Sequence, residues 1–215
     1  MRPIPLLSSA YLAPVRYFVR LYDSPLVVIE TCDNYVKQTY RNRCLISGPN
    51  GVQALTVPIE KPSFGKSTMR DIRISDHGNW RHQHWNALQS NYERSPFFEF
   101  YADDLRPFYE HPVTFLFDFN EGLQQTILSL LELHPIIQHT ETYLTVPPAE
   151  MEDLRDVISP KHAWQDDSSF TPYPYYQVFA RKHGFLPDLS IVDLLFNMGP
   201  EARIVLKKSL QSPLK

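Results

Sequence analysis

The sequence is poor in cysteine and glycine and contains no long hydrophobic run. Its two cysteines, Cys32 and Cys44, are too few for a disulfide framework, which favours a reducing, cytoplasmic location. No apolar stretch reaches the roughly 20 residues of a transmembrane helix, so we expect no membrane-spanning segment. The first seven residues include two prolines and lack the continuous apolar core of a signal peptide.

Positive charge is not in excess either. The chain has 21 Lys and Arg against 24 Asp and Glu, and its net charge of −3 argues against a nucleic-acid partner. Glycine-rich nucleotide-binding loops and the nucleophile motif of α/β-hydrolases are absent, and no set of His, Cys and carboxylate residues has zinc-like spacing. We therefore predict no metal site, and the sequence leaves the cofactor unknown.

Proline and aromatic residues are abundant. There are 19 Pro against 7 Gly, together with 13 Phe, 12 Tyr and 3 Trp. Proline restricts the backbone of the connections, and aromatic rings supply a large apolar volume for a core. This composition is typical of a stable globular domain.

Strand patterns dominate the first part of the chain. Residues 26–29 form a short buried-strand run, and residues 40–46 predict the next strand. The turn signal at residues 48–51 leads into a third strand over 52–59. Residues 69–75 alternate between apolar and charged side chains, which predicts a half-buried strand.

Helical patterns follow the strands. Apolar residues three and four apart predict helices over 79–92, 97–109, 113–133 and 190–198. Residues 143–175 are rich in proline and acidic residues and predict a long excursion over the surface. This order predicts an α+β or mixed α/β fold, in which an N-terminal strand-rich half packs against a C-terminal helical half. We expect one compact domain across residues 1–215.

The densest polar cluster is the segment from Lys37 to Arg43. In an extended conformation Lys37, Arg41 and Arg43 lie on one side and Asn42 on the other. Guanidinium groups on one face can grip a phosphate or carboxylate, and the lysine adds a point charge. The alternative is a solvated face of a sheet, held by salt bridges.

Four polar residues lie in helical segments that are otherwise apolar. His84 shares a face with Trp80 and can act as a general acid or base, or it can be a core-edge histidine bonded to a carbonyl. Asn120 falls in the apolar stripe of the longest helix and either pins a loop or lines a pocket. Asp193 and Asn197 are four residues apart, so they either bond a ligand or cap a neighbouring backbone.

An ordered series of short motifs covers nearly the whole chain. The series reads Ala10-Tyr11-Leu12, Lys37-x-x-x-x-Asn42-Arg43, Leu55-Thr56-Val57-Pro58, Asn79-Trp80-x-x-x-His84-Trp85-x-x-Leu88, Pro96-Phe97-Phe98, Asn120, Tyr176-Gln177 and Leu189-Ser190-Ile191-x-Asp193-Leu194-Leu195-Phe196-Asn197-x-Gly199-Pro200. On these residues the chain resembles the WbqC-like family over about residues 6–206. The resemblance implies a part in making surface polysaccharides such as O-antigen.

Two segments depart from the pattern that many members of this family share. Leu7-Ser8-Ser9 stands where many members have His-Gln-Pro, and Thr145-Val146 stands where many have Ser-Gly. The first change removes two groups that can bind or react, and the second removes a flexible backbone position. This branch is therefore expected to differ in its substrate or its role.

These observations lead to two hypotheses of function. The first is an enzyme, favoured as a transferase, that acts on an anionic activated sugar or similar metabolite of surface-glycan or envelope precursor synthesis. His84 and Lys37 are its expected catalytic residues, and its expected substrate-binding residues are Tyr11, Arg41, Asn42, Arg43, Thr56, Asn120, Asp193 and Asn197. The second is a non-catalytic binding or assembly protein for the same processes. A homodimer is compatible with either.

Overall fold

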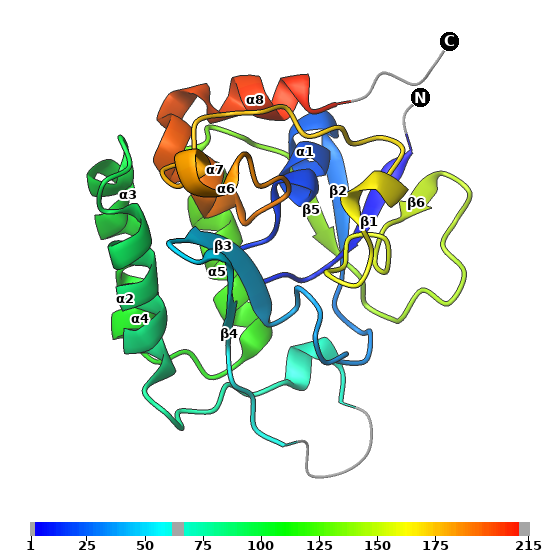
Figure 1. Cartoon of the computed structure of the whole chain (residues 1–215). Coiled ribbons are helices and arrows are strands. Elements are labelled where there is room, and N and C mark those ends of the chain that lie inside the picture. The colour runs from blue at the N-terminus through cyan, green and yellow to red at the C-terminus, as the bar shows by residue number, and fades with distance from the viewer. Residues whose placement is uncertain (1–2, 62–66, 211–215) are drawn as a thin grey trace.

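A four-stranded parallel sheet organises the fold (Figure 1). The computed structural model describes residues 3–61 and 67–210. The strands are β1 (Ile4–Ser8), β2 (Leu26–Glu30), β5 (Ile136–His139) and β6 (Met151–Asp153). They lie in the order β5-β2-β1-β6, and every neighbouring pair is parallel.

The first half of the sheet is one βαβ unit. Strand β1 continues through helix α1 (Val15–Asp23) to β2, and Leu6 of β1 pairs with Val28 of β2. The central residues of both strands are buried, as expected for strands covered on both faces. The apolar runs in these two strands therefore arise because both faces are buried, whereas a half-exposed strand would alternate apolar and polar residues.

A long insertion separates β2 from its neighbour β5. It contains the hairpin β3 (Arg43–Gly48) and β4 (Gly51–Thr56), the short helix η1 (Met69–Asp71), and the helices α2 (Trp80–Tyr92), α3 (Phe98–Leu105), α4 (Pro107–Glu110) and α5 (Leu116–Leu130). Figure 1 shows α2, α3 and α4 together at one side of the molecule, with the hairpin between them and the parallel sheet. Helix α5 then leads back to the sheet through β5.

The C-terminal part closes the fold over the βαβ unit. It contains η2 (Trp164–Asp166), α6 (Ala180–His183), α7 (Ile191–Met198), η3 (Gly199–Glu201) and α8 (Ala202–Lys208). Helix α8 packs on α1, and α7 packs between α3 and β3. Gly199 has φ +53°, and a Cβ there would lie 2.5 Å from the Phe97 ring, so only glycine fits this turn.

The mixed α/β class and the single compact domain are confirmed. The sheet, however, takes β5 and β6 from the second half of the chain. Residues 143–175 are thus more than a surface excursion, since they supply β6, whose three residues are too few to give a pattern. The strand predicted over 69–75 is wrong, because η1 occupies its start and only isolated bridges follow. No helix in the described ranges has the length and apolarity to cross a membrane.

Asn120 on α5 ties together loops from two other parts of the chain. Its side-chain amide donates to Ser9 Oγ at 3.1 Å and to the backbone carbonyl of Arg41 at 2.8 Å. Both bonds are buried, so Asn120 holds the segment after β1 and the segment before β3 against the same helix. Of the two alternatives for this residue, the structure thus shows the loop pin.

Replacing Asn120 with alanine is expected to destabilise the protein by about 2 kcal/mol, because the buried Arg41 carbonyl loses a hydrogen-bond donor. Urea unfolding followed by circular dichroism measures the change. Gln125→Ala is the matched control, since Gln125 lies on the same helix with an exposed bond to Glu121, and its cost should stay below about 0.5 kcal/mol. Equal stability of the two variants would contradict the assigned role.

Candidate functional site

The order of the strands indicates where a ligand can bind, at the edge formed by the carboxyl ends of the strands. From β1 the chain moves to β2 on one side, whereas the connection after β5 returns to β6 on the other side of β1. In open parallel sheets such a switch point leaves a crevice at the carboxyl ends of the strands, and ligands bind there. In this protein Ser8, Glu30 and Asp153 end β1, β2 and β6 at that edge.

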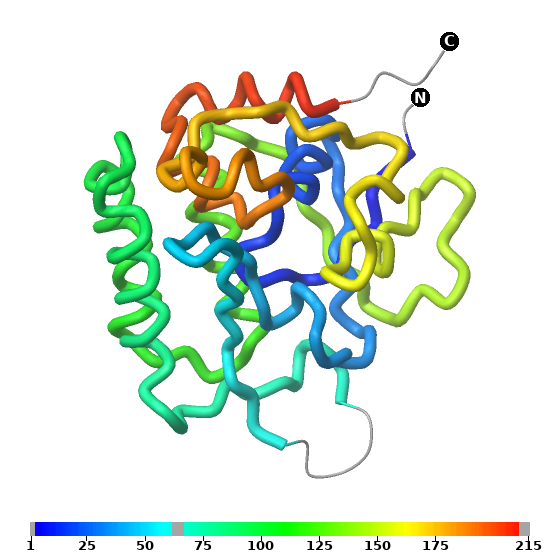
Figure 2. The backbone as a smooth tube through the Cα atoms, in the orientation of Figure 1, coloured from blue at the N-terminus to red at the C-terminus, as the bar shows by residue number. Residues whose placement is uncertain are grey.

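A hollow of about 350 Å³ lies at this edge and is called the switch-point hollow below. It is lined by Asp33, Asn34, Tyr35, Val36, Arg41, Tyr143, Arg155 and Asp156. These residues come from the segment after β2, the connection from β5 to β6, and the segment after β6. Figure 2 shows this connection as the yellow-green loop on one side of the molecule.

Asp33 and Arg41 form a buried ion pair in the wall of this hollow. Arg41 donates from both Nε, at 3.0 Å, and Nη2 to Asp33 Oδ2, and also from Nη2 to Ser8 Oγ at 2.9 Å. The second carboxylate oxygen, Asp33 Oδ1, is buried and has no hydrogen-bond partner. Burial raises the pKa of the Asp33 carboxyl, and this effect outweighs the opposing effect of Arg41.

Glu30 is a fully buried carboxylate that holds the neighbouring wall. Its oxygens accept hydrogen bonds from Cys32 N at 2.9 Å, Thr140 Oγ1 at 2.6 Å, Leu144 N at 3.1 Å and Arg155 Nη1 at 3.1 Å. Both oxygens are therefore partnered, in contrast to Asp33. These bonds fasten the connection after β5 to the end of β2.

Arg155 continues the wall beyond β6. Its Nε and Nη2 donate to the two oxygens of Asp153 at 2.9 and 2.6 Å, and its guanidinium lies 5.0 Å from the centre of the Tyr143 ring. The hydrogen bonds from Arg155 lower the pKa of the Asp153 carboxyl. The guanidinium group of Arg155 is thus hydrogen-bonded to carboxylates and also packs against an aromatic ring.

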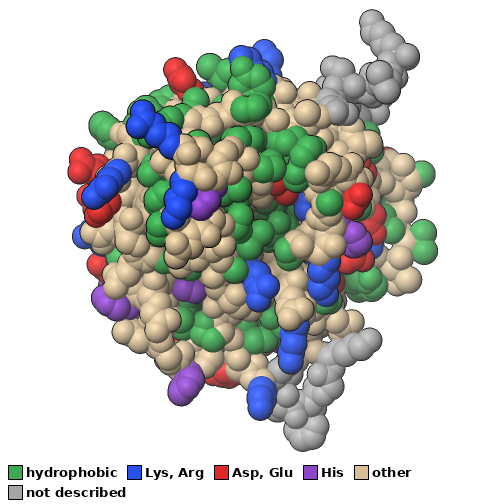
Figure 3. Space-filling model, viewed as in Figure 1, with side chains coloured by type: hydrophobic (Ala, Val, Ile, Leu, Met, Phe, Trp, Pro, Cys, Tyr) green, Lys and Arg blue, Asp and Glu red, His purple; other side chains and the backbone are tan. Residues whose placement is uncertain are grey.

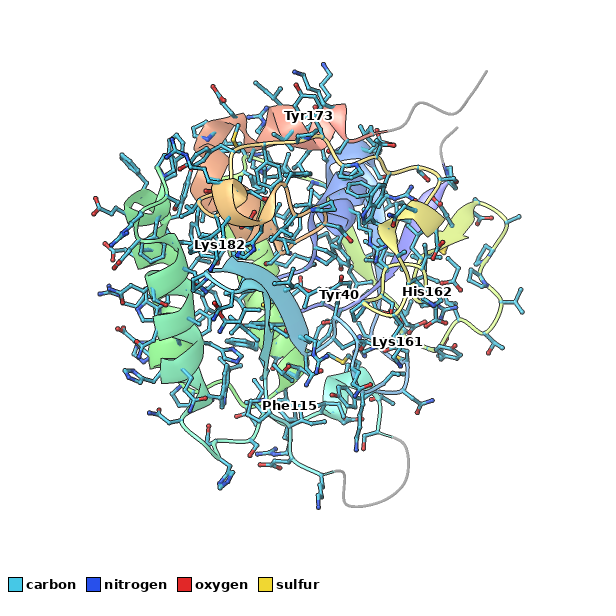
Figure 4. The ribbon with its side chains drawn as sticks, viewed as in Figure 1. Tyr40, Phe115, Lys161, His162, Tyr173 and Lys182 are labelled. Atoms are coloured by element: carbon cyan, nitrogen blue, oxygen red, sulfur yellow. The ribbon has the colours of Figure 1, made fainter. Side chains whose placement is uncertain are left out.

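A third arginine, Arg16, joins helix α1 to the segment after β6. Arg16 on α1 is buried and donates to the carbonyls of Ser159 and His162 at 3.0 and 3.4 Å. It also hydrogen-bonds the side chain of Tyr40. Figure 4 shows Tyr40 between the hairpin and the segment that carries His162.

The predicted cluster from Lys37 to Arg43 divides in the structure. The shared face predicted for Lys37, Arg41 and Arg43 is wrong, because the strand begins only at Arg43 and Arg41 is buried. Asn42 is buried as well and donates to the carbonyl of Val57 at 2.8 Å, and Lys37 lies in an exposed turn.

Arg43 and Thr56 face each other across the hairpin. Arg43 Nε donates to Thr56 Oγ1 at 3.1 Å, and this contact is exposed. Arg43 also acts electrostatically on Tyr35 in the wall of the hollow. Figure 3 shows Lys and Arg side chains spread over this view of the surface and separated by hydrophobic and neutral areas.

Tyr11 and His84 lie together in the core, away from the hollow. The Tyr11 hydroxyl is 2.9 Å from both His84 Nδ1 and the Tyr109 hydroxyl. Burial lowers the pKa of His84 to about 4, and a hydrogen bond with the Thr56 backbone opposes this effect. His84 is therefore neutral at pH 7. Tyr109 also lines a second hollow, of about 320 Å³, whose lining does not include His84.

Asp193 and Asn197 belong to a third, separate group. Asp193 accepts hydrogen bonds from the hydroxyls of Tyr92 and Tyr175, each at 2.7 Å, and from Gln177 Nε2 at 2.8 Å. Burial raises the pKa of its carboxyl, and these hydrogen bonds oppose that effect. Asn197 donates to the backbone carbonyl of Asp193 at 2.7 Å, a contact within α7, whereas the bonds of Asp193 to Tyr92, Tyr175 and Gln177 join α7 to its surroundings.

The structure thus brings Arg41 to the switch-point hollow, with Lys37 and Arg43 nearby and Asn120 behind Arg41. Asp33, Tyr143 and Arg155 were not singled out from the sequence. The available signal for Asp33 was its place shortly after a buried strand, three residues beyond Glu30. In residues 3–61 and 67–210, no group of three or more His, Cys, Asp or Glu side chains is arranged to hold a metal ion.

The lowered pKa of His84 predicts a loss of stability in acid. Because the folded protein disfavours protonated His84, its contribution is complete above about pH 6.5 and falls as the pH drops toward 4. The loss is at most about 3 kcal/mol. Urea unfolding between pH 7 and 4 should show a smaller decline for His84→Gln than for the wild type. His82→Gln, exposed on the same helix, should keep the wild-type profile, and a wild-type profile for His84→Gln would refute the prediction.

Comparison with known proteins gives one family and one curated relative. The chain is 28% identical over 228 residues to an uncharacterized protein of Mycobacterium tuberculosis, covering 94% of this chain and 96% of the relative. No solved structure gives a significant match. The model of the WbqC-like protein family matches residues 9–165, well over half of the chain and including Asp33, Arg41 and Arg155. The chain belongs to the WbqC-like protein family.

Proposed function

We propose that the protein is an enzyme, a transferase with its reaction centre in the switch-point hollow. Its donor is an anionic activated sugar or similar metabolite of surface-glycan or envelope precursor synthesis. The observation that carries this proposal is Asp33 Oδ1, a buried carboxylate oxygen without a partner in the wall of a hollow at the carboxyl edge. An unsatisfied buried acceptor costs folding free energy, and one that lies beside a hollow is explained by a ligand that supplies the missing donor.

Asp33 has the properties of a general base. Burial raises the pKa of the Asp33 carboxyl, so its carboxylate takes a proton more readily than an exposed one. Arg41 and Ser8 fix the other oxygen, and Asn120 holds the backbone of Arg41. This support keeps Oδ1 in one orientation, as proton transfer requires.

The cations at the rim suit the anionic part of the donor. Lys37 follows the lining residue Val36 and is exposed, so its ammonium group is available to a ligand. Arg43 uses Nε for Thr56, and its guanidinium lies close enough to Tyr35 to affect the pKa of that hydroxyl. A phosphate or carboxylate at this rim would meet both charges.

The role predicted for His84 stays a prediction. We assign the proton transfer to Asp33 because the Nδ1 atom of His84 is bonded to Tyr11 in the core. A non-catalytic binding protein is the alternative and could use the same hollow, so the test of donor binding below decides between the two.

A thermal-shift screen tests the donor site. Nucleotide sugars, nucleotides, acyl-CoAs and simple acidic metabolites are added to the wild type, Lys37→Ala and Arg43→Ala. A ligand at a hundred times its Kd stabilises by about 2.7 kcal/mol, which raises the Tm of a domain of this size by about 5–10 °C. We expect one compound class to give this rise in the wild type and a clearly smaller rise in both variants.

Arg203→Ala is the matched control. Arg203 is an exposed arginine on α8 that pairs with Glu132, so its removal changes the net charge equally without touching the hollow. A full shift in Arg43→Ala would place the anion elsewhere. If no compound shifts the wild type, the transferase proposal loses to the binding-protein alternative.

A further inference from the structure

The residues that line the switch-point hollow, taken together with the carboxylates bonded to them, carry more negative than positive charge. Two carboxylates, Asp33 and Asp156, and two guanidinium groups, Arg41 and Arg155, line it. Arg155 is also bonded to two further carboxylates behind the lining, those of Glu30 and Asp153. The six groups together leave an excess of two negative charges when all are ionised. Two nearby cations are directed at other groups: Arg43 Nε donates to Thr56 Oγ1 at 3.1 Å, and Arg70 Nη2 donates to the Thr140 carbonyl at 3.3 Å.

Both guanidinium groups are occupied by these carboxylates. Arg41 directs Nε and Nη2 at Asp33 and Ser8, and Arg155 directs Nε, Nη1 and Nη2 at Asp153 and Glu30. Few N–H groups of these two arginines therefore remain to bind an anion in the hollow. An incoming ligand therefore meets acceptors there rather than donors.

One of these acceptors, Asp33 Oδ1, is buried and lacks a hydrogen-bond donor. Asp33 is 5% exposed, and its Oδ1 atom has no hydrogen-bond donor. Glu30, at the same edge, is fully buried and has donors on both oxygens, so this part of the fold can satisfy a buried carboxylate completely. Asp167 Oδ2 is also buried without a partner, but Asp167 does not line the hollow, whereas Asp33 does.

The aromatic walls agree with the excess negative charge. Tyr35 and Tyr143 both line the hollow, and the Arg155 guanidinium lies over the Tyr143 ring, 5.0 Å from its centre. Tyrosine faces and carboxylates together favour a compact cation with several N–H donors.

We propose that the switch-point hollow binds a primary amine, whose ammonium group donates a hydrogen bond to Asp33 Oδ1 and faces the carboxylate of Asp156. The amine is then the acceptor substrate, with the anionic donor at the rim formed by Lys37 and Arg43. Its place as acceptor rests on the proposed transferase function, whereas the binding of the amine does not.

The chemistry of the step balances on these groups. The ammonium group gives one proton to Asp33 Oδ1 and becomes a free amine. Its lone pair forms the new nitrogen–carbon bond to the donor, and the bond to the anionic leaving group breaks with its electron pair. The leaving group takes the second proton from nitrogen, and Asp33 releases its proton to water when the product leaves.

Binding of a matched pair of probes tests the amine site directly. Fluorine NMR titrations compare 4-fluorobenzylamine with 4-fluorobenzyl alcohol, which differ in the ammonium group. We expect the amine to bind at pH 7 at least about tenfold more tightly than the alcohol, because a charged hydrogen bond to a buried carboxylate is lost with the alcohol. Equal binding of the two probes, or no binding of the amine, would overturn the proposal.

Three variants locate the binding. Asp33→Asn should weaken amine binding at least about tenfold, and Asp156→Asn should weaken it to a smaller extent. Asp156 is exposed, so its variant remains informative even if Asp33→Asn does not fold. Asp76→Asn, in the lining of the second hollow, is the control and should bind as the wild type does. If Asp156→Asn and a folded Asp33→Asn both bind the amine as tightly as the wild type, the proposed site is wrong.

The two proposals fail separately. Amine binding that depends on Asp33, without any donor shift in the thermal screen, would leave the amine site standing and remove the transferase. A donor shift that depends on Arg43, without amine binding, would leave the donor site standing and remove the amine.

Discussion

The buried carboxylate of Glu30 is the constraint on which the carboxyl edge of the sheet depends. A carboxylate without contact to water must be hydrogen-bonded or paired, since an unpaired charge in the interior costs several kcal/mol. Glu30 meets this requirement with Thr140, Leu144 and Arg155, all of which come from the second half of the chain. These bonds draw the connection after β5 across the edge, and the wall of the hollow follows from them.

The elements that could be predicted are those with a long or unbroken apolar pattern. Helices α2 and α7 and strand β2 lie close to their predicted bounds because each buries one continuous face or run. Strands β5 and β6 have four and three residues, so only their pairing with β2 and β1 defines them. Such pairing is a long-range property that a local pattern does not contain.

The candidate site was predictable only in part. Arg41 stood out because it lies in a polar segment of the sequence. The orientation of its side chain depends on the ion pair with Asp33, and no rule of sequence spacing connects these two residues. A single aspartate in a loop has no pattern, and its unpartnered oxygen exists only in three dimensions. In contrast, His84 and Asp193 stood out as polar residues in apolar helices. Both prove to be bonded to buried tyrosines, which is what the interior of a protein requires of them.

The position of the long insertion has a consequence for synthesis and folding. Leu26 of β2 pairs with Ile136, and Ile4 of β1 pairs with Met151. The central strands β1 and β2 are therefore synthesised well before the strands that pair with their outer edges. Contacts of such high sequence separation slow folding, and unpaired parallel edges can join with other chains. The β1–α1–β2 unit therefore spends most of translation with two open edges. This period is when a nascent chain of this protein depends most on chaperones.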